Sequence, residues 1–226
     1  MARRIVLTSV GSYGDLHPFI ATGLALEARG FEVVIAASED YREKVENEGL
    51  RFHPAGPSID RVRIDTGLDS AGMVRQVAQS STIFLVEKTI IPYAEHTFEE
   101  LNACMRGADL VVASSFAIVA RLVIARLGLP SVSLLLSPCA IFSAQQPPYL
   151  VEAPWLPALG RALGPWAVER VMDLGRAQLR WRTRRIAAFR RRLGLPPTPR
   201  RTSRSALSNW SPRSGQISCG LPARRA

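Results

Sequence analysis

The chain has 226 residues and a formal net charge of +10, and apolar residues make up 47% of it. This apolar share can build a sizeable core, so the composition excludes a chain that is disordered throughout. No stretch of about 18 uncharged apolar residues occurs, so we expect no membrane-spanning helix. The apolar run at residues 5–10 is too short for a signal peptide, and we therefore expect a cytoplasmic protein.

Charge is distributed unevenly along the sequence. Residues 1–150 carry 13 basic and 16 acidic side chains, whereas residues 151–226 carry 16 basic and 3 acidic ones. No acidic residue follows Asp173. The three cysteines, Cys104, Cys139 and Cys219, are far apart, and their spacing fits neither a metal site nor a disulfide framework. The first two-thirds therefore predicts an ordinary globular domain, and the basic last third needs its own explanation.

Apolar runs alternate with amphipathic segments through the first 136 residues. The apolar runs predict strands at residues 4–10, 31–37, 50–53, 108–114 and 131–136. Between them, residues 17–29, 39–48 and 116–127 predict helices, each followed by a glycine that suits a helix C-cap. Such alternation is typical of an α/β, Rossmann-like doubly wound parallel sheet. We expect the strand order 3-2-1-4-5, with helices on both faces.

The remaining segments are less regular. Residues 55–69 lack a clear period and predict a loop, residues 70–106 predict a helix interrupted at Pro92, and residues 137–157 hold five of the 16 prolines and predict an irregular loop. Residues 159–193 predict helix with a break near Gly164 and Pro165. Their apolar residues suggest one buried stripe: Val168, Val171, Met172, Leu179, Ile186, Phe189 and Leu193.

These patterns divide the chain into three parts. Residues 1–157 are expected to form the Rossmann-like domain, and residues 158–197 a helical segment that closes it. Residues 198–226 are rich in Arg, Ser, Pro and Gly and contain no acid, which predicts a disordered or aberrant tail.

Ligands of a doubly wound sheet bind beyond the carboxyl ends of its strands. In this sequence that edge would be lined by the first loop, residues 11–17, and by the ends of the fourth and fifth strands. Two glycines of the first loop are expected to allow positive φ and a close approach to a ligand. The candidate binding residues are Gly11, Ser12, Gly14, His17, Ser114, Ser115, Phe116 and Ser137.

Asp15 occupies the place where a dinucleotide-binding loop would receive phosphate. A carboxylate at a helix N-terminus would repel a pyrophosphate, although Glu39 after the second strand keeps a dinucleotide site open as an alternative. Asp is also a preferred N-cap residue, here for a helix beginning near His17. The residues alone therefore leave two roles for Asp15, a helix cap or a carboxylate that faces a ligand.

Three stretches carry a resemblance to a known family. GSYGDLHPFIATGLALEARGFEVVIAA, residues 11–37, resembles the opening of GT-B nucleotide-sugar glycosyltransferases of the sterol, macrolide and glycopeptide type, which share the family 28 N-terminal domain. ADLVVASSFAIVARLVIARLGLPSVSLLLSP, residues 108–138, resembles the family's fourth strand, helix and fifth strand. FRRRLGLPP, residues 189–197, resembles the segment that closes the acceptor-binding half. The likeness covers residues 3–197.

The resemblance implies inverting transfer of a hexose from a nucleotide-diphosphate sugar to the hydroxyl of a lipid, sterol or polyketide-like acceptor, without metal or cofactor. It places the general base at Asp15. In members with a His base, an Asp near the end of the fourth strand orients the imidazole. The matching position here is Ser114, so Asp15 is expected to act without an orienting partner, and His17 is not expected to be the base.

The family binds its nucleotide-sugar co-substrate mainly in a second Rossmann-like half with a His-Gly-Gly diphosphate loop. No such motif occurs in this sequence. We therefore expect an acceptor domain that lacks its donor domain and is inactive alone.

Two other classes of function stay open. One is a standalone module that binds a hydrophobic acceptor or a partner carrying the donor half. The other uses the basic last third, where residues 176–192 hold eight arginines and no acid, to bind an anionic surface. No aromatic-basic interleaving accompanies these arginines, so we expect no specific nucleic-acid binding and favour a solvated helix face. Peripheral contact with an anionic membrane remains an alternative.

Overall fold

The computed structural model describes residues 3–69, 72, 86–136, 143–147 and 153–197. The predicted tail, residues 198–226, and Ser137 lie outside the described residues.

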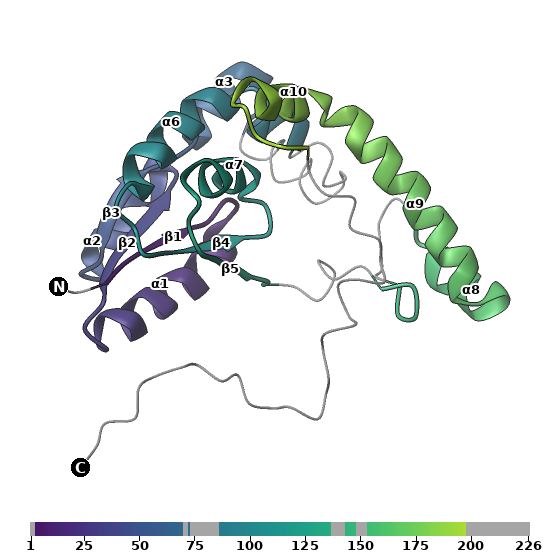
Figure 1. The fold of residues 1–226 in the computed structure, drawn as a ribbon, viewed down its shortest axis with the longest axis horizontal. Helices are drawn as coiled ribbons and strands as arrows, with labels where there is room; N and C mark the ends of the chain where they lie inside the picture. Colours follow the sequence, from purple (N-terminus) through teal and green to yellow (C-terminus); the bar gives the residue numbers. More distant parts are fainter. Residues whose placement is uncertain (1–2, 70–71, 73–85, 137–142, 148–152, 198–226) are drawn as a thin grey trace, which may run out of the picture.

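A five-stranded parallel sheet forms the centre of the fold, in the order β3-β2-β1-β4-β5 (Figure 1). In register, Leu7 of β1 lies between Ile35 of β2 and Val112 of β4. The order, the direction and the five strands confirm the prediction. The strands are β1 (Arg4–Thr8), β2 (Glu32–Ala37), β3 (Arg51–Pro54), β4 (Leu110–Ser114) and β5 (Ser131–Leu134).

Helices cover both faces of the sheet because successive strand residues point to opposite sides. Ile5 and Leu7 pack toward α1 (Tyr13–Glu27) and α2 (Arg42–Asn47), which follows the 3-10 turn Glu39–Tyr41. Val6 packs on the other face, toward α6 (Ala94–Met105) and α7 (Ile118–Leu127). Each face has its own apolar core, as the alternation of strands and helices predicts.

The first helix starts earlier than its sequence suggests. α1 begins at Tyr13 with Ser12 as N-cap, so the predicted start near His17 is wrong, and Asp15 is the third helical residue and not the N-cap. Pro18 therefore lies inside the helix, in its second turn, where it has no N–H to donate to the Gly14 carbonyl. Gly14 is a helical residue without positive φ, and of the two loop glycines only Gly11 has one, at 141°.

A short helix replaces part of the loop predicted at residues 55–69. α3 (Ile59–Thr66) begins at Ser58, whose Oγ accepts a hydrogen bond from the Arg61 amide at 3.2 Å. It ends at Gly67, which adopts a left-handed conformation with φ of 68°. Both ends of the helix are therefore capped. Because Val62 is its one buried residue, the helix has too few apolar residues to show a helical period in the sequence. Further on, residues Val86–Ile90 form a π-helical turn before α6.

Three helices follow the sheet: α8 (Leu156–Leu163), α9 (Pro165–Arg182) and α10 (Arg184–Arg192). The predicted break is confirmed at Gly164, which has φ of 79°. α8 and most of α9 extend away from the sheet, and α10 returns to it (Figure 1). Most of the predicted apolar stripe is at least partly buried, but Leu179, in the last turn of α9, is exposed.

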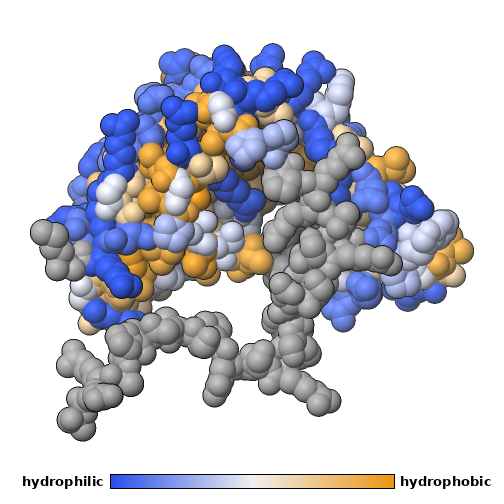
Figure 2. Space-filling view, viewed as in Figure 1, coloured by the Kyte–Doolittle hydropathy of each residue, from blue (hydrophilic) through white to orange (hydrophobic). Residues whose placement is uncertain are grey.

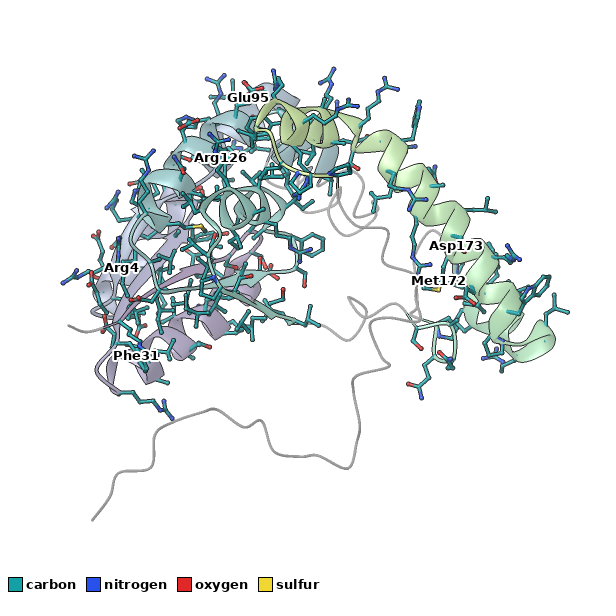
Figure 3. All side chains as sticks on the ribbon, viewed as in Figure 1. Arg4, Phe31, Glu95, Arg126, Met172 and Asp173 are labelled. Atoms are coloured by element: carbon teal, nitrogen blue, oxygen red, sulfur yellow. The ribbon has the colours of Figure 1, made fainter. Side chains whose placement is uncertain are left out.

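α10 is anchored on the helices of the sheet domain. The rings of Phe189 and Phe98 meet edge to face at 5.4 Å between centroids. Nearby, an Arg126 guanidinium nitrogen donates to the Leu193 carbonyl at 2.5 Å, and Arg192 pairs with Glu95. Figure 3 labels Arg126 and Glu95 where α10 meets the domain, and Met172 on the outlying part of α9.

The two edges of the sheet differ. β5 pairs only with β4 among the described residues, and Ser131, Val132 and Ser133 on it are exposed. On the opposite edge, Arg51 of β3 reaches back to Glu32 of β2 at 2.7 Å. In the part of the chain that the structure describes, no helix is both long and apolar enough to cross a bilayer.

Candidate functional site at the carboxyl edge of the sheet

The loop between β1 and α1 is fixed at each of its four residues. Ser9 donates from its hydroxyl to the Asp15 carbonyl at 3.2 Å, and the Val10 amide donates to Ser114 Oγ at 3.3 Å. The Gly11 carbonyl accepts from the Tyr41 hydroxyl, and the Ser12 amide donates to the Asp15 carboxylate. The loop therefore has one defined shape before any ligand binds.

The Asp15 carboxylate is held through one of its two oxygens. Asp15 Oδ2 accepts from the Ser12 amide at 2.8 Å and from the Ser12 hydroxyl at 3.1 Å. Within the described part of the chain, Oδ1 has no hydrogen-bond partner, and the side chain is partly exposed. The expectation that Asp15 has no orienting partner is therefore wrong, because Ser12 orients it. The second oxygen is left to accept a hydrogen bond from a ligand.

Gly11 makes this arrangement sterically feasible. A Cβ at this position would lie 2.2 Å from Asp15 Oδ2, far inside van der Waals contact. Its φ of 141° is also one that residues with a side chain rarely adopt. The carboxylate thus occupies the space that a side chain at position 11 would fill. It also takes the Ser12 amide, a donor that an incoming phosphate would otherwise use.

Tyr41 supports the loop from the end of β2. Its hydroxyl donates to the Gly11 carbonyl at 2.7 Å, and its ring packs edge-on against Tyr13 at 4.9 Å. Burial, together with the negative charges of Asp40 and Asp15, raises the pKa of Tyr41 to about 12. The hydroxyl therefore stays protonated and remains a donor to the loop across the physiological range.

The structure brings only one of the β4 candidates into contact with the loop. Ser114 is buried, and its Oγ accepts from the Val10 amide. Ser115 and Phe116 follow in a partly exposed turn, and none of their recorded hydrogen bonds reaches the loop. Ser137 lies outside the described residues.

His17 lies on a different side of α1 from Asp15. Two helical positions correspond to a rotation of about 200°, so the two side chains cannot share a face. The His17 ring lies against Tyr13, with 5.8 Å between centroids, and is exposed. The alternative ribose-binding carboxylate, Glu39, is bound by the Arg42 side chain, and that hydrogen bond lowers the pKa of Glu39.

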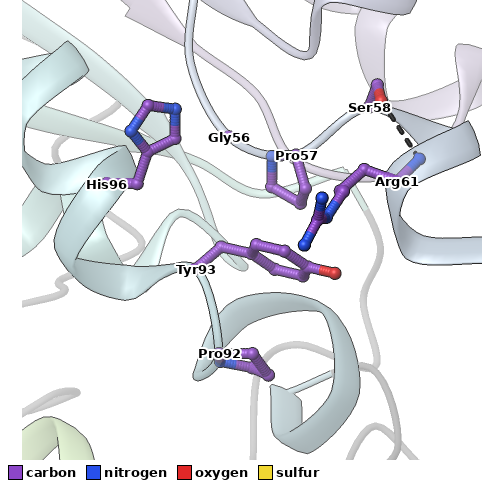
Figure 4. Close-up of a pocket in the computed structure, with 7 residues that line it drawn as sticks. All are labelled: Gly56, Pro57, Ser58, Arg61, Pro92, Tyr93 and His96. Carbon is purple, nitrogen blue, oxygen red and sulfur yellow. Dashed lines mark hydrogen bonds between the residues drawn. The ribbon is translucent and has the colours of Figure 1, made fainter. Parts of the chain in front are cut away.

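A pocket of about 410 Å³ opens at the same edge of the sheet, beyond the end of β3. In Figure 4 the Tyr93 ring extends across it toward the Arg61 side, and His96 stands on α6. Asp15 does not line it. The lining residues are Gly56, Pro57, Ser58, Arg61, Pro92, Tyr93 and His96.

The polar groups of this pocket are already paired. The Tyr93 hydroxyl donates to Asp65 at 2.5 Å, and Arg61 reaches the same oxygen at 3.0 Å. The Tyr93 hydrogen bond is the main cause that lowers the pKa of Asp65. On the other side, Glu100 accepts from the Gly56 amide at 2.8 Å and pairs with His96. With these charges satisfied, the prolines and the Tyr93 ring remain as an apolar surface.

The pocket wall is connected to the first loop through the end of β2. The Ile59 amide donates to Asp40 at 2.7 Å, and Ser38 donates to the Pro57 carbonyl at 2.9 Å. Tyr41, next to Asp40, holds Gly11. These contacts join three consecutive loops at the carboxyl edge, and nothing in the sequence pattern indicated the roles of Tyr41 or Asp40. In the described residues, no cluster of His, Cys, Asp and Glu is placed to hold a metal.

Comparisons with known proteins find similarity to glycosyltransferases. The O-mycaminosyltylonolide 6-deoxyallosyltransferase of Streptomyces fradiae is 30% identical over 206 residues, which are 86% of this chain and 44% of that protein. The glycosyltransferase GtfE of Amycolatopsis orientalis is 26% identical over 210 residues, which are again 86% of this chain and 44% of that protein. The chain thus spans less than half the length of these curated relatives.

The fold is shared with the glycosyltransferase SnogD from Streptomyces nogalater, whose structure has a TM-score of 0.53. The match covers 88% of this chain and 43% of that one, at 19% identity. The glycosyltransferase family 28 N-terminal domain matches residues 5–131, which is more than half of the chain. These residues include the first loop, Asp15 and all of the sheet except Arg4 at its start and residues 132–134 at its end. The chain therefore belongs to the glycosyltransferase family 28 N-terminal domain family.

Proposed function

We propose that residues 3–197 form the acceptor-binding half of an inverting, nucleotide-sugar-dependent glycosyltransferase, in which Asp15 is the general base. The observation that carries the proposal is the Asp15 carboxylate, held through Oδ2 with Oδ1 available at the ligand-binding edge of the sheet. Family membership supplies the class of reaction.

In the proposed reaction, the acceptor hydroxyl donates a hydrogen bond to Asp15 Oδ1. As the acceptor oxygen bonds to the anomeric carbon, its proton passes to Oδ1 and the nucleoside diphosphate leaves with the electrons of the broken C–O bond. Attack from the face opposite the leaving group inverts that carbon. Ser12 keeps the carboxylate in one orientation, which reduces the entropy lost in reaching the reactive geometry.

We assign a largely apolar acceptor to this site. The pocket beyond β3 falls within the usual size of small-molecule sites, about 300–1,000 Å³. Its prolines and the Tyr93 ring give it an apolar wall, and its charged groups are paired internally. The acceptor named for the Streptomyces fradiae relative, O-mycaminosyltylonolide, is compatible with such a wall. Binding of the nucleotide sugar is assigned mainly to the part of the relatives that this chain does not match.

The test joins residues 1–197 to the carboxyl-terminal part of a relative and compares the fusion with its Asp15→Asn variant. Asn keeps the shape and can still accept from the Ser12 amide, so the free energy of unfolding should fall by no more than about 1 kcal/mol, the effect of losing a negative charge near the helix N-terminus. Turnover should fall by about 10²- to 10⁴-fold if Asp15 removes the proton. His17→Gln is the matched control, and it should retain most of the turnover.

Two outcomes would contradict the proposal. Full turnover by the Asp15→Asn fusion would leave Asp15 with only a structural role at the start of α1. Loss of turnover in His17→Gln, with Asp15→Asn active, would move the base to His17. Affinity for a hydrophobic acceptor, measured calorimetrically on the 226-residue chain, tests acceptor binding apart from catalysis.

A further inference from the structure

α9 has a second apolar face that no described residue covers. Val168 and Met172 on its inner face are buried, whereas three large side chains on the opposite side are exposed: Trp166 at 66%, Leu174 at 73% and Trp181 at 64%. At about 100° per residue, these three lie within about 80° of one another around the helix axis. They therefore form one stripe, which we call the outer stripe of α9.

The outer stripe is long and lies on the part of the molecule that extends away from the sheet. Fifteen residues separate its ends, or about 22 Å along a helix. Leu163 and Trp155, on and before α8, are also at least half exposed. In Figure 2, hydrophobic residues are visible at the outlying end of the molecule, where Figure 1 places α8 and α9.

An arginine lies against each tryptophan of the outer stripe. The guanidinium of Arg170 lies 5.9 Å from the Trp166 ring, and that of Arg184 lies 5.1 Å from the Trp181 ring. Neither arginine, nor Arg180 or Arg185, has an acidic partner within the described residues. These guanidinium groups are therefore available to an anionic partner.

The acidic groups near the stripe do not offset this charge. α9 carries two of them, Glu169 and Asp173. Asp173 is paired with Arg176 at 2.7 Å, and Glu169 has an interaction of its own and is only partly exposed. Arg182, on the inner side, is paired with Glu87 at 3.1 Å. The net charge along the outer side of α9 and the start of α10 is positive.

We propose that the outer stripe of α9 binds the surface of an anionic lipid bilayer. Trp side chains favour the interface between headgroups and hydrocarbon, an aliphatic residue between them can enter the acyl region, and arginines beside them can pair with lipid phosphates. The helix would lie parallel to the membrane plane. This inference does not depend on the role of Asp15.

A bilayer fits the stripe better than a nucleic acid does. Duplex binding relies mainly on basic and polar side chains that contact phosphates and base edges, and apolar contacts there are limited to thymine methyl groups and to wedges between base steps. Leu174, at the centre of the stripe, is its most exposed member. The combination of Trp, Leu and unpaired Arg is what an amphipathic interfacial helix presents.

The experiment measures co-sedimentation of the 226-residue protein with phosphatidylcholine vesicles, with and without about one third phosphatidylglycerol. We expect binding to the anionic vesicles and little to the neutral ones. Replacement of Trp166, Leu174 and Trp181 by Ser should lower the partition coefficient at least about tenfold. The matched control is Ile64→Ser on α3, since Ile64 is 75% exposed and lies outside the stripe.

A second measurement uses the unaltered protein. Lipids brominated near the headgroup should quench the Trp fluorescence of the bound protein. Bound protein without quenching, or equal binding by the triple variant, would overturn the proposal and assign binding to arginines elsewhere. Binding to duplex DNA but not to anionic vesicles would overturn it in favour of a nucleic acid. Concentration-dependent dimerisation that the triple variant abolishes, without vesicle binding, would assign the stripe to a second copy of the chain.

Discussion

Replacing Gly11 by Ala should disrupt the first loop and the orientation of Asp15 together. The added Cβ would lie 2.2 Å from Asp15 Oδ2, and the φ of 141° would be strained for any residue with a side chain. Backbone strain of this kind costs about 1–3 kcal/mol. The carboxylate must also move, and losing its hydrogen bond to the Ser12 amide adds about 1–2 kcal/mol for a partly exposed pair. We expect Gly11→Ala to lower the free energy of unfolding by about 2–5 kcal/mol.

Urea denaturation followed by circular dichroism measures this change, and two glycines serve as controls. Gly30 has φ of 83° but no atom within 4 Å of an added Cβ, so Gly30→Ala reports backbone strain alone. Gly14 is helical, with its nearest neighbour 3.5 Å from an added Cβ, so Gly14→Ala should be neutral or slightly stabilising. If Gly11→Ala is no worse than Gly30→Ala, the close packing of Asp15 against Gly11 is refuted.

Three further predictions concern stability. Ser114→Ala should lower the free energy of unfolding by about 1 kcal/mol, because it removes the acceptor of the Val10 amide. Equal urea midpoints for the variant and the wild type would contradict this. Ser58→Ala should cost about 1 kcal/mol by removing the cap that accepts from Arg61, and it should speed amide exchange across α3; unchanged exchange there would show that the cap is unimportant. Burial raises the pKa of the Cys104 thiol to about 11. Between about pH 8.5 and pH 11 the thiol is ionised in the unfolded chain but still neutral in the folded protein. The stability that the neutral buried thiol contributes is therefore complete below about pH 8.5 and is lost as the pH rises toward 11. In urea titrations the stability of the wild type relative to Cys104→Ala should fall over that window, and a pH-independent difference would contradict the assigned cause.

The sheet was predictable because the apolar residues of each strand show that the strand is buried. Runs such as residues 31–37 are apolar on both faces, and only a sheet covered by helices on both sides buries such runs. Short connections and right-handed crossovers then restrict the strand order. None of this requires knowledge of individual side-chain contacts.

The predicted helix boundaries were wrong where polar capping side chains, and not apolar periodicity, determine where a helix starts or ends. The helix was predicted to start near His17, whereas Ser12 and Asp15 start it one turn earlier. α3 is bounded by Ser58 and Gly67, which are readable cap signals, but its single buried residue gives no period to support them.

At the candidate site, the sequence indicated Asp15, Gly11 and Ser114 but not what holds them. The Tyr41 hydroxyl reaches the Gly11 carbonyl across 30 positions of sequence, and Asp40 reaches the Ile59 amide across 19. Such contacts depend on how two crossovers pack at one edge, which local patterns do not encode. The expected lack of an orienting partner for Asp15 was wrong because the amide and hydroxyl of Ser12, which was predicted to bind a ligand, both donate to Asp15 Oδ2.

The exposed strand β5 makes the sheet open to growth on one side. Its outer backbone groups are unpaired within the described residues, and Val132 on it is 52% exposed. An unprotected strand of this kind is a template on which another strand can form hydrogen bonds, from the same polypeptide or from a neighbouring molecule. β3 is a poorer template because it ends at Pro54, which has no amide hydrogen to donate. Lateral addition should therefore be directional, starting preferentially at β5 and extending the sheet away from β1.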